Sequence, residues 1–298
     1  MVSWIQQRVY SLQQKLEGWL QPLCVLSVLA ILLYAAEVIS AEQEPPQRVI
    51  SLAPHITELV YAVGAGDKLV AVSDYSDYPQ QAQALPRVNS FAALNIEAIL
   101  ALKPDLVLAW RSGNPPADLA RLSQFGIRVE FSDPILLDDI AKELAQIGQW
   151  LGHAEQGQQL AQQVQQRLTA LRQRYAEQTP LKVFYAMSIE PLSTVANQAW
   201  PAQMLTGCGA ENIFADAKTD YPQPQLEQLL VRQPAVIVRA LKDSRAQDQF
   251  WQRYQSIPAV TQQAFITLEP DWVYRATPRM LDAMQQLCEQ LHRYRQVD

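Results

Sequence analysis

Short apolar runs alternate with segments of helical spacing over residues 48–152. The runs are four or five residues long, the usual length of a buried strand, and they cover residues 49–53, 69–72, 106–110 and 127–131. Between them, apolar side chains recur every three or four residues over 56–63, 96–102 and 117–125. This alternation predicts βα units around a mostly parallel sheet.

A single long helix interrupts the alternation. Leu160, Val164, Leu168, Leu171 and Tyr175 form one apolar stripe at spacings of four, four, three and four, and no proline lies between residues 154 and 178. Such a helix would be about 35 Å long at 1.5 Å per residue. The βα pattern resumes near residue 182, which favours a strut joining two lobes over a plain surface helix.

The second half of the chain repeats the first. Residues 95–108 align without gaps to residues 225–238, so that Glu97 corresponds to Glu227. We therefore predict an α/β fold with two similar Rossmann-like lobes, at 48–152 and 180–298, joined by a backbone helix at 153–179. A ligand would bind in the cleft between the lobes, because pockets favour domain interfaces and the carboxyl ends of parallel strands.

Residues 1–47 follow a different pattern. Arg8 and Lys15 precede an apolar run over 23–36, and the small residues Ser40 and Ala41 follow it. This order is typical of an export signal, and the run is short for a transmembrane helix, which needs about 20 residues. We expect export to the periplasm, with an uncleaved N-terminal anchor as the alternative.

Composition and motifs argue against several classes of function. A net charge of −6 disfavours nucleic-acid binding, which needs a basic surface. The sequence has no G-x-S-x-G, Walker or H-E-x-x-H motif, and His55, His153 and His292 lack metal-ligand spacing. We therefore predict neither an enzyme nor a metal site. His55 follows the first predicted strand and is a weak candidate for an axial ligand to a bound metallo-macrocycle, the alternative being a helix-start residue.

Two cysteines, Cys208 and Cys288, lie beyond the predicted export signal. An even pair in an exported chain suggests a disulfide. Two buried thiols would also fit the sequence, so both interpretations stay open at this point.

Aromatic side chains gather at predicted strand ends and in the loops after them. They are Tyr75, Tyr78, Phe91, Trp110, Tyr221, Trp272 and Tyr274. One aromatic residue in such a place usually serves packing, but several from both lobes predict a wide apolar ligand with polar edges. Asp271 and Arg275 flank Trp272, where they would either pair with each other or form hydrogen bonds at the ligand rim.

Glu97 and Glu227 are the equivalent acids of the repeat. Each falls in the first turn of a predicted helix, where the helix dipole stabilises a carboxylate by about 0.3–1 kcal/mol. That effect explains each residue alone. An acid at the same place in both lobes also suits docking onto a two-fold partner with two basic sockets.

The chain resembles a known family, the periplasmic vitamin B12-binding proteins of bacterial ABC importers, within the helical-backbone class that also carries haem and siderophores. The resemblance runs from about residue 48 to the C-terminus. It rests on residues 73–79, 101–107, 109–111, 209–214, 271–272 and 275–279. The Lys-Pro-Asp-Leu-Val segment at 103–107 marks the whole class, whereas the tyrosine-rich run, Ala-Trp-Arg and Asp-Trp are more specific to the B12 proteins.

The resemblance implies a role for several residues. Tyr75 and Trp110 would contact the corrin from the first lobe, and Asp271 and Arg275 from the second, with Trp272 shaping the same loop. It also implies that Glu97 and Glu227 pair with arginines of the permease, and that Cys208 is bonded to Cys288.

Some positions depart from the family pattern. Phe91 and Tyr221 stand where the relatives have tryptophan, and both keep the predicted pocket aromatic. Ser193 stands where an aromatic residue is expected, and His55 replaces a small polar residue. A corrinoid with a different lower base would therefore fit as well.

We accordingly predict a monomeric substrate-binding component that captures cobalamin in the cleft and delivers it to a permease dimer in the inner membrane, without a catalytic cofactor. A haem or ferric-siderophore carrier of the same fold is the alternative. The missing catalytic motifs disfavour a corrinoid-modifying enzyme, and the position of the aromatic residues disfavours a surface adhesin.

Overall fold

The computed structural model describes residues 44–89, 93–196 and 198–296. Residues from Pro46 onward form one compact unit, and all the helices and strands of the described residues lie within it. The predicted export signal and anchor lie outside the described residues. Within the described ranges, no helix is both long and apolar enough to span a bilayer.

The first lobe is built on a parallel sheet with the strand order β2-β1-β3-β4. Its strands are β1 (Val49–Ser51), β2 (Leu69–Val72), β3 (Leu106–Trp110) and β4 (Val129–Ser132). Its helices are α2 (Pro54–Ala62), η1 (Gly66–Lys68), η2 (Gln80–Ala84), α3 (Ile96–Ala101), α4 (Pro116–Gln124) and α5 (Asp139–Trp150). The strands are short and mostly buried, as expected for a sheet covered by helices on both faces.

The second lobe repeats this arrangement with the strand order β10-β9-β5-β8. Its strands are β5 (Leu181–Ala186), β8 (Ala210–Asn212), β9 (Val236–Ala240) and β10 (Phe265–Leu268), with a small hairpin of β6 (Ser188–Ile189) and β7 (Leu192–Ser193). Its helices are α7 (Trp200–Gly207), α8 (Leu226–Arg232), α9 (Arg245–Trp251), α10 (Pro258–Thr261), α11 (Pro270–Val273) and α12 (Arg279–Arg295).

The two sheets are equivalent strand by strand. The first and second strands of each lobe lie side by side, and the third and fourth are placed on the other side of the first. The loop before the third strand is also alike, because Lys103 and Gln233, which both precede a proline, have φ angles of 47° and 50°. The predicted two-lobed α/β fold is confirmed, as is the repeat that predicted it.

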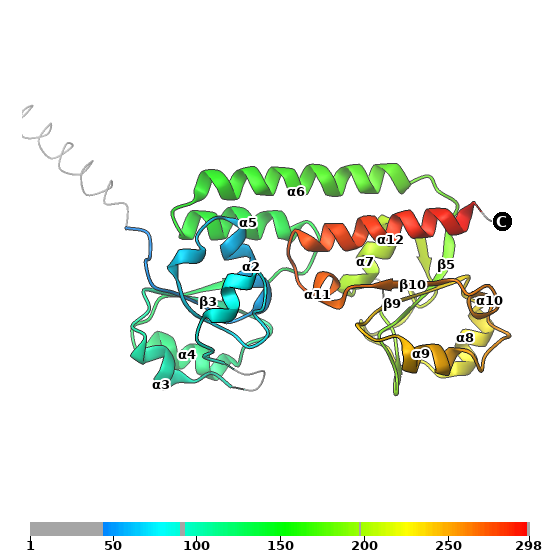
Figure 1. The fold of residues 1–298 in the computed structure, drawn as a ribbon, viewed down its shortest axis with the longest axis horizontal. Coiled ribbons are helices and arrows are strands. Elements are labelled where there is room, and N and C mark those ends of the chain that lie inside the picture. The colour runs from blue at the N-terminus through cyan, green and yellow to red at the C-terminus, as the bar shows by residue number, and fades with distance from the viewer. Residues whose placement is uncertain (1–43, 90–92, 197, 297–298) are drawn as a thin grey trace, which may run out of the picture. The chain divides into compact units, whose positions relative to one another are not determined.

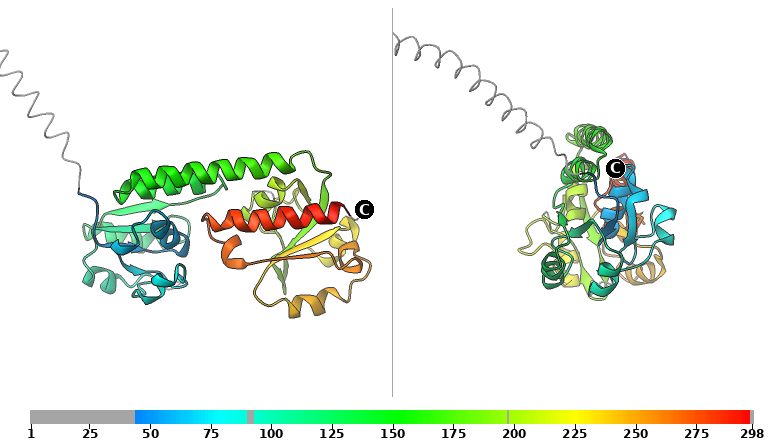
Figure 2. Two further views of the ribbon diagram at one scale, coloured as in Figure 1. Left: turned by 45° about the horizontal axis from the view of Figure 1, so that its top comes forward. Right: turned by 90° about the vertical axis from the view of Figure 1, so that its left-hand side faces the viewer.

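The long helix α6 (Ala154–Tyr175) runs along one side of both sheets (Figures 1 and 2). Its first half packs against α5, and Gly157 permits a close approach because a Cβ there would lie 2.6 Å from the Leu144 carbonyl oxygen. Its second half packs against α7 and α12 of the second lobe. Four of the five predicted positions of its stripe are buried, whereas Leu160 is half-buried, and Gly157 and Ala161 are buried in addition.

Further contacts join the lobes beside α6. The Gln203 amide on α7 donates to the Ile135 carbonyl at 2.9 Å and accepts from the Leu137 amide at 3.1 Å. Within the second lobe, a disulfide joins Cys208, at the end of α7, to Cys288 on α12, and both residues are fully buried. The main apolar core includes side chains of both lobes and of α6.

Candidate functional site

Exposed aromatic side chains concentrate at the segments just after the strands. Six aromatic residues are exposed in the described part of the chain. Five of them are Tyr75 and Tyr78 after β2, Trp110 at the end of β3, Tyr221 between β8 and α8, and Tyr274 after α11. The sixth, Phe125, comes after α4. Large apolar side chains left in water at one end of the sheets mark a candidate binding surface.

Hydrogen bonds between buried hydroxyl groups hold the loop that carries Tyr75. Thr57 on α2 donates to Ser76 at 3.0 Å, and Ser76 lies 2.8 Å from Ser73. Arg87 donates to the carbonyl oxygens of Ser73 and Ser76 at 2.8 and 2.9 Å. Tyr75 itself has a φ of 62° and is 74% exposed. A non-glycine residue in this conformation is uncommon, and such residues cluster at functional sites.

Arg275 links the second lobe to this loop. Its guanidinium donates to Glu58 at 2.9 Å, to Asp77 at 2.7 Å, to Asp271 at 3.1 Å and to the Tyr75 carbonyl at 3.1 Å. The side chain is almost fully buried. Of the two alternatives that the sequence leaves open for Asp271 and Arg275, the structure contains the ion pair.

These ion pairs also set the protonation of the groups involved. Burial alone would raise the pKa of Asp77, but the hydrogen bond and the charge of Arg275 lower it. Burial alone would lower the pKa of Arg275, but its bonds to Asp77 and Glu58 raise it. Asp77 and Arg275 are therefore both charged at neutral pH, and this buried charge needs its pairing to be stable away from water.

Trp110 is held between the backbone of its own turn and a histidine. Its amide donates to the Asn114 side chain at 2.7 Å, and a Cβ on Gly113 would collide with its ring. The His55 ring meets the indole edge to face with centroids 5.5 Å apart. Trp110 is 38% exposed, so one part of the ring packs and another part is free to meet a ligand.

His55 is the second residue of α2, at the start of a helix and not in a loop. Its Nε2 lies 3.2 Å from the Ser132 hydroxyl, and the side chain is buried. Burial lowers its pKa to about 4, which keeps the imidazole neutral at physiological pH. Within the described residues, no group of three or more potential ligands could hold a metal ion.

The second lobe contributes tyrosine hydroxyl groups. The hydroxyl groups of Tyr185, at the end of β5, and Tyr274 lie 3.2 Å apart. Burial raises the pKa of both, so both remain protonated donors. Trp272 lies in the short helix α11 and packs partly against the core, which differs from the expected loop position. Tyr221 is exposed.

The remaining predicted residues fall into two groups. Phe91 lies outside the described residues. Glu97 and Glu227 are each the second residue of their helices, α3 and α8, and both are exposed. The two helices lie on the side of the unit away from α6 (Figure 1).

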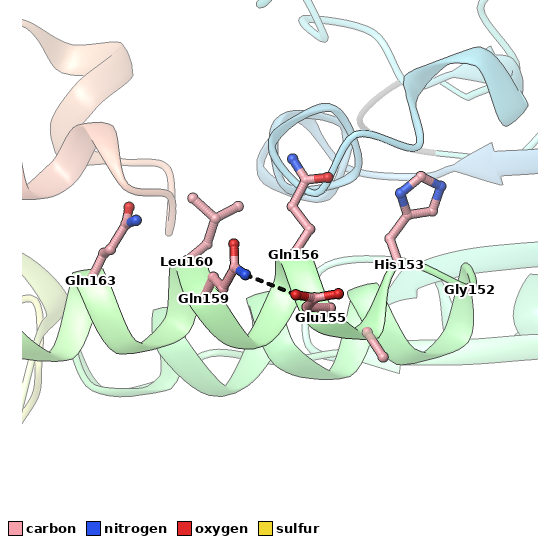
Figure 3. Close-up of a pocket in the computed structure, with 8 residues that line it drawn as sticks. Gly152, His153, Glu155, Gln156, Gln159, Leu160 and Gln163 are labelled. Carbon is pink, nitrogen blue, oxygen red and sulfur yellow. Dashed lines mark hydrogen bonds between the residues drawn. The ribbon is translucent and has the colours of Figure 1, made fainter.

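Two hollows on the surface lie away from these residues. One, of about 450 Å³, borders the start of α6 and is lined by polar side chains such as His153, Gln156 and Gln159 (Figure 3). The other, of similar volume, lies where α6 meets α7 and is lined by Asp138, Arg172 and neighbouring residues. Neither hollow contains a predicted ligand-binding residue. The candidate site therefore consists of the exposed aromatic side chains and of Arg275 with its acidic partners.

Sequence reasoning predicted Asp271 and Arg275 and missed the other charged members of the cluster around Arg275, among them Glu58 and Arg279. Glu58 is the only charged residue of α2, and it lies on the buried face of this helix. A lone acid inside an otherwise apolar helix was the available signal, because a buried carboxylate requires a cationic partner. The partner itself lies more than 200 residues away, so the sequence does not name it.

Comparison with known proteins identifies the family of the chain. The family described as periplasmic binding protein matches residues 49–272. The chain belongs to this family. A vitamin B12-binding protein from Vibrio cholerae serotype O1 is 44% identical over 260 residues, which cover 87% of this chain and 94% of that protein. A vitamin B12-binding protein from Yersinia pestis is 45% identical over 247 residues, covering 82% and 86%.

Solved structures of the family have the same fold. The crystal structure of the periplasmic vitamin B12-binding protein BtuF of Vibrio cholerae superimposes with a TM-score of 0.77 at 45% identity, covering 84% of this chain and 98% of that one. The periplasmic heme-binding protein RhuT from Roseiflexus sp. RS-1 gives a TM-score of 0.75 at 24% identity, over 84% and 99%. The second likeness shows the fold alone.

Proposed function

We propose that this periplasmic binding protein captures vitamin B12 at the strand ends of its two lobes and delivers it to the permease of an ABC importer. The observation that carries the proposal is 44% identity to a vitamin B12-binding protein along 94% of that protein's length. The exposed aromatic side chains support it physically, because a corrinoid presents a wide apolar face with amides at its rim.

The proposed contacts come from both lobes. Tyr75, Phe91 and Trp110 would meet the ligand from the first lobe, and Tyr221 and Trp272 from the second. Asp271 and Arg275, already paired with each other, would lie at the rim of the ligand. We infer that the protein acts as a monomer in the periplasm and changes no bond of its cargo.

Calorimetric titration with cyanocobalamin, with haemin in a parallel titration, tests the function directly. We expect saturable one-to-one binding of cobalamin with a Kd of about 1 μM or below, which corresponds to about −8 kcal/mol. Tight binding of haemin without binding of cobalamin would move the function to haem uptake.

Trp110→Ala tests the aromatic site. We expect cobalamin affinity to fall by about 1–3 kcal/mol, as on loss of a stacking anchor. Phe125→Ala is the matched control, because Phe125 is also an exposed aromatic residue but comes after α4. Equal affinities for wild type and Trp110→Ala would remove Trp110 from the site.

Glu97 and Glu227 are proposed to dock the protein onto a permease dimer. Replacing both by lysine is expected to abolish B12 uptake in cells and to leave the calorimetric Kd unchanged, since both side chains are exposed and lie in α3 and α8. The control replaces Glu155 and Glu177 by lysine, which changes the net charge equally at the two ends of α6. Normal uptake by the Glu97→Lys, Glu227→Lys protein would rule out the docking role.

A further inference from the structure

We infer that Glu58 is a positioning residue of the binding site, which holds the two arginines that fix the binding loops of both lobes relative to each other. The inference rests on the proposed function. Glu58 lies on α2 of the first lobe and is 4% exposed. It makes no part of the exposed aromatic surface, so it would act through other residues.

Both carboxylate oxygens of Glu58 are engaged by the second lobe. Oε1 accepts from Arg275 Nη1 at 2.9 Å and from Arg279 Nη2, and Oε2 accepts from Arg279 Nε at 2.9 Å. Arg279 begins α12, and Arg275 lies in the turn just before it. One buried acid of the first lobe thus holds two successive cations of the second.

Each of these arginines also holds a tyrosine of the first lobe. Arg275 donates to the Tyr75 carbonyl at 3.1 Å and pairs with Asp77 at 2.7 Å. The Arg279 guanidinium lies over the Tyr78 ring, 3.8 Å from its centroid, in a cation–π contact. Glu58 therefore sets where the arginines lie, and the arginines set where Tyr75 and Tyr78 lie.

The charges of the cluster balance. Glu58, Asp77 and Asp271 supply three carboxylates, and Arg275, Arg279 and Lys242 supply three cations. Loss of the Glu58 charge leaves a buried surplus of positive charge, which is costly without a partner. The guanidinium groups would move toward Asp77, Asp271 and water, and the tyrosines would move with them.

Glu58→Gln in the full-length chain is the test, because it keeps the shape of the side chain and removes its charge. We expect the calorimetric Kd for cyanocobalamin to rise at least tenfold. Glu58→Asp restores the charge on a shorter side chain and is expected to recover part of the affinity. Arg279→Lys, which removes the bidentate contact but keeps a cation, is expected to weaken binding in the same direction by a smaller factor.

A stability control separates positioning from folding. Leu122→Ala empties part of the first-lobe core on α4, and it is expected to lower the Tm without changing the Kd. A lower Tm for Glu58→Gln with the wild-type Kd would show a merely structural role and overturn the inference. Failure of the wild-type protein to bind cobalamin would instead contradict the proposed function, so the two failures are distinct.

Discussion

Replacing Cys208 and Cys288 together by alanine is expected to lower the free energy of unfolding by about 4 to 5 kcal/mol. The disulfide closes a loop of 80 residues, and a cross-link of that span removes much of the conformational entropy of the unfolded chain. It also ties the end of α7 to the middle of α12, two helices that pack against α6. Unfolding in guanidinium chloride, monitored by circular dichroism, measures the difference.

The wild-type protein with its disulfide reduced is the matched control for that experiment. It keeps both sulfur atoms, so it separates loss of the cross-link from the small cavities that alanine leaves in a fully buried site. We expect the reduced protein to lose most of the same stability. Unfolding free energies of oxidised and reduced protein within about 1 kcal/mol of each other would contradict the expectation.

The second large effect concerns pH. Burial lowers the pKa of His55 from 6.5 to about 4. Between pH 6.5 and pH 4, His55 is therefore protonated in the unfolded chain and neutral in the folded protein. Stability is therefore complete above pH 6.5 and falls as the pH drops toward 4, by about 3 kcal/mol from this residue. His55→Gln cannot take up this proton and is expected to lose less stability than wild type over the same window.

Other groups titrate nearby, so the difference between the two proteins is the quantity to measure. Burial raises the pKa of Glu143, which opposes the histidine because its folded form takes up a proton first. The pKa values of Asp77 and Asp138 are lowered, and their contributions are lost at more acidic pH. The measurement is the free energy of chemical unfolding of both proteins at pH 7 and at pH 4.5. Equal losses of unfolding free energy in wild type and His55→Gln would contradict the prediction, because they would show that His55 is protonated in the folded protein at pH 4.5.

Local pattern predicted most of the architecture. The apolar runs placed the first-lobe strands within two residues of their observed bounds, and the internal repeat predicted a second, similar lobe. The predicted first-lobe helices were also placed within two residues of their observed bounds. Helix α3, for example, was expected over residues 96–102 and ends at Ala101, shortly before Pro104. Helix α5 went unpredicted, although Ile140, Leu144 and Ile147 have helical spacing.

The candidate site was predictable only in part. Tyr75 and Trp110 were candidates because aromatic residues gather at the predicted strand ends, and both side chains are exposed in the structure. The pairing of Glu58 was not found, since Glu58 is separated from Arg275 by 217 residues and from Arg279 by 221, and these residues meet only after both lobes are folded and joined. Likewise, the packing of Trp272 depends on the core beneath α11, which no local pattern specifies.

Helix α6 has a consequence for how the ligand leaves. Helix α6 has 22 residues and packs on both lobes. Because a helix resists stretching, the lobes can separate only if α6 bends. Gln203 on one side and Glu58 on the other add hydrogen bonds that any such bending must break. We therefore expect the lobes to keep their relative placement when the proposed ligand binds, so that binding costs little ordering entropy. With the proposed docking through Glu97 and Glu227, the permease would supply the mechanical work of unloading.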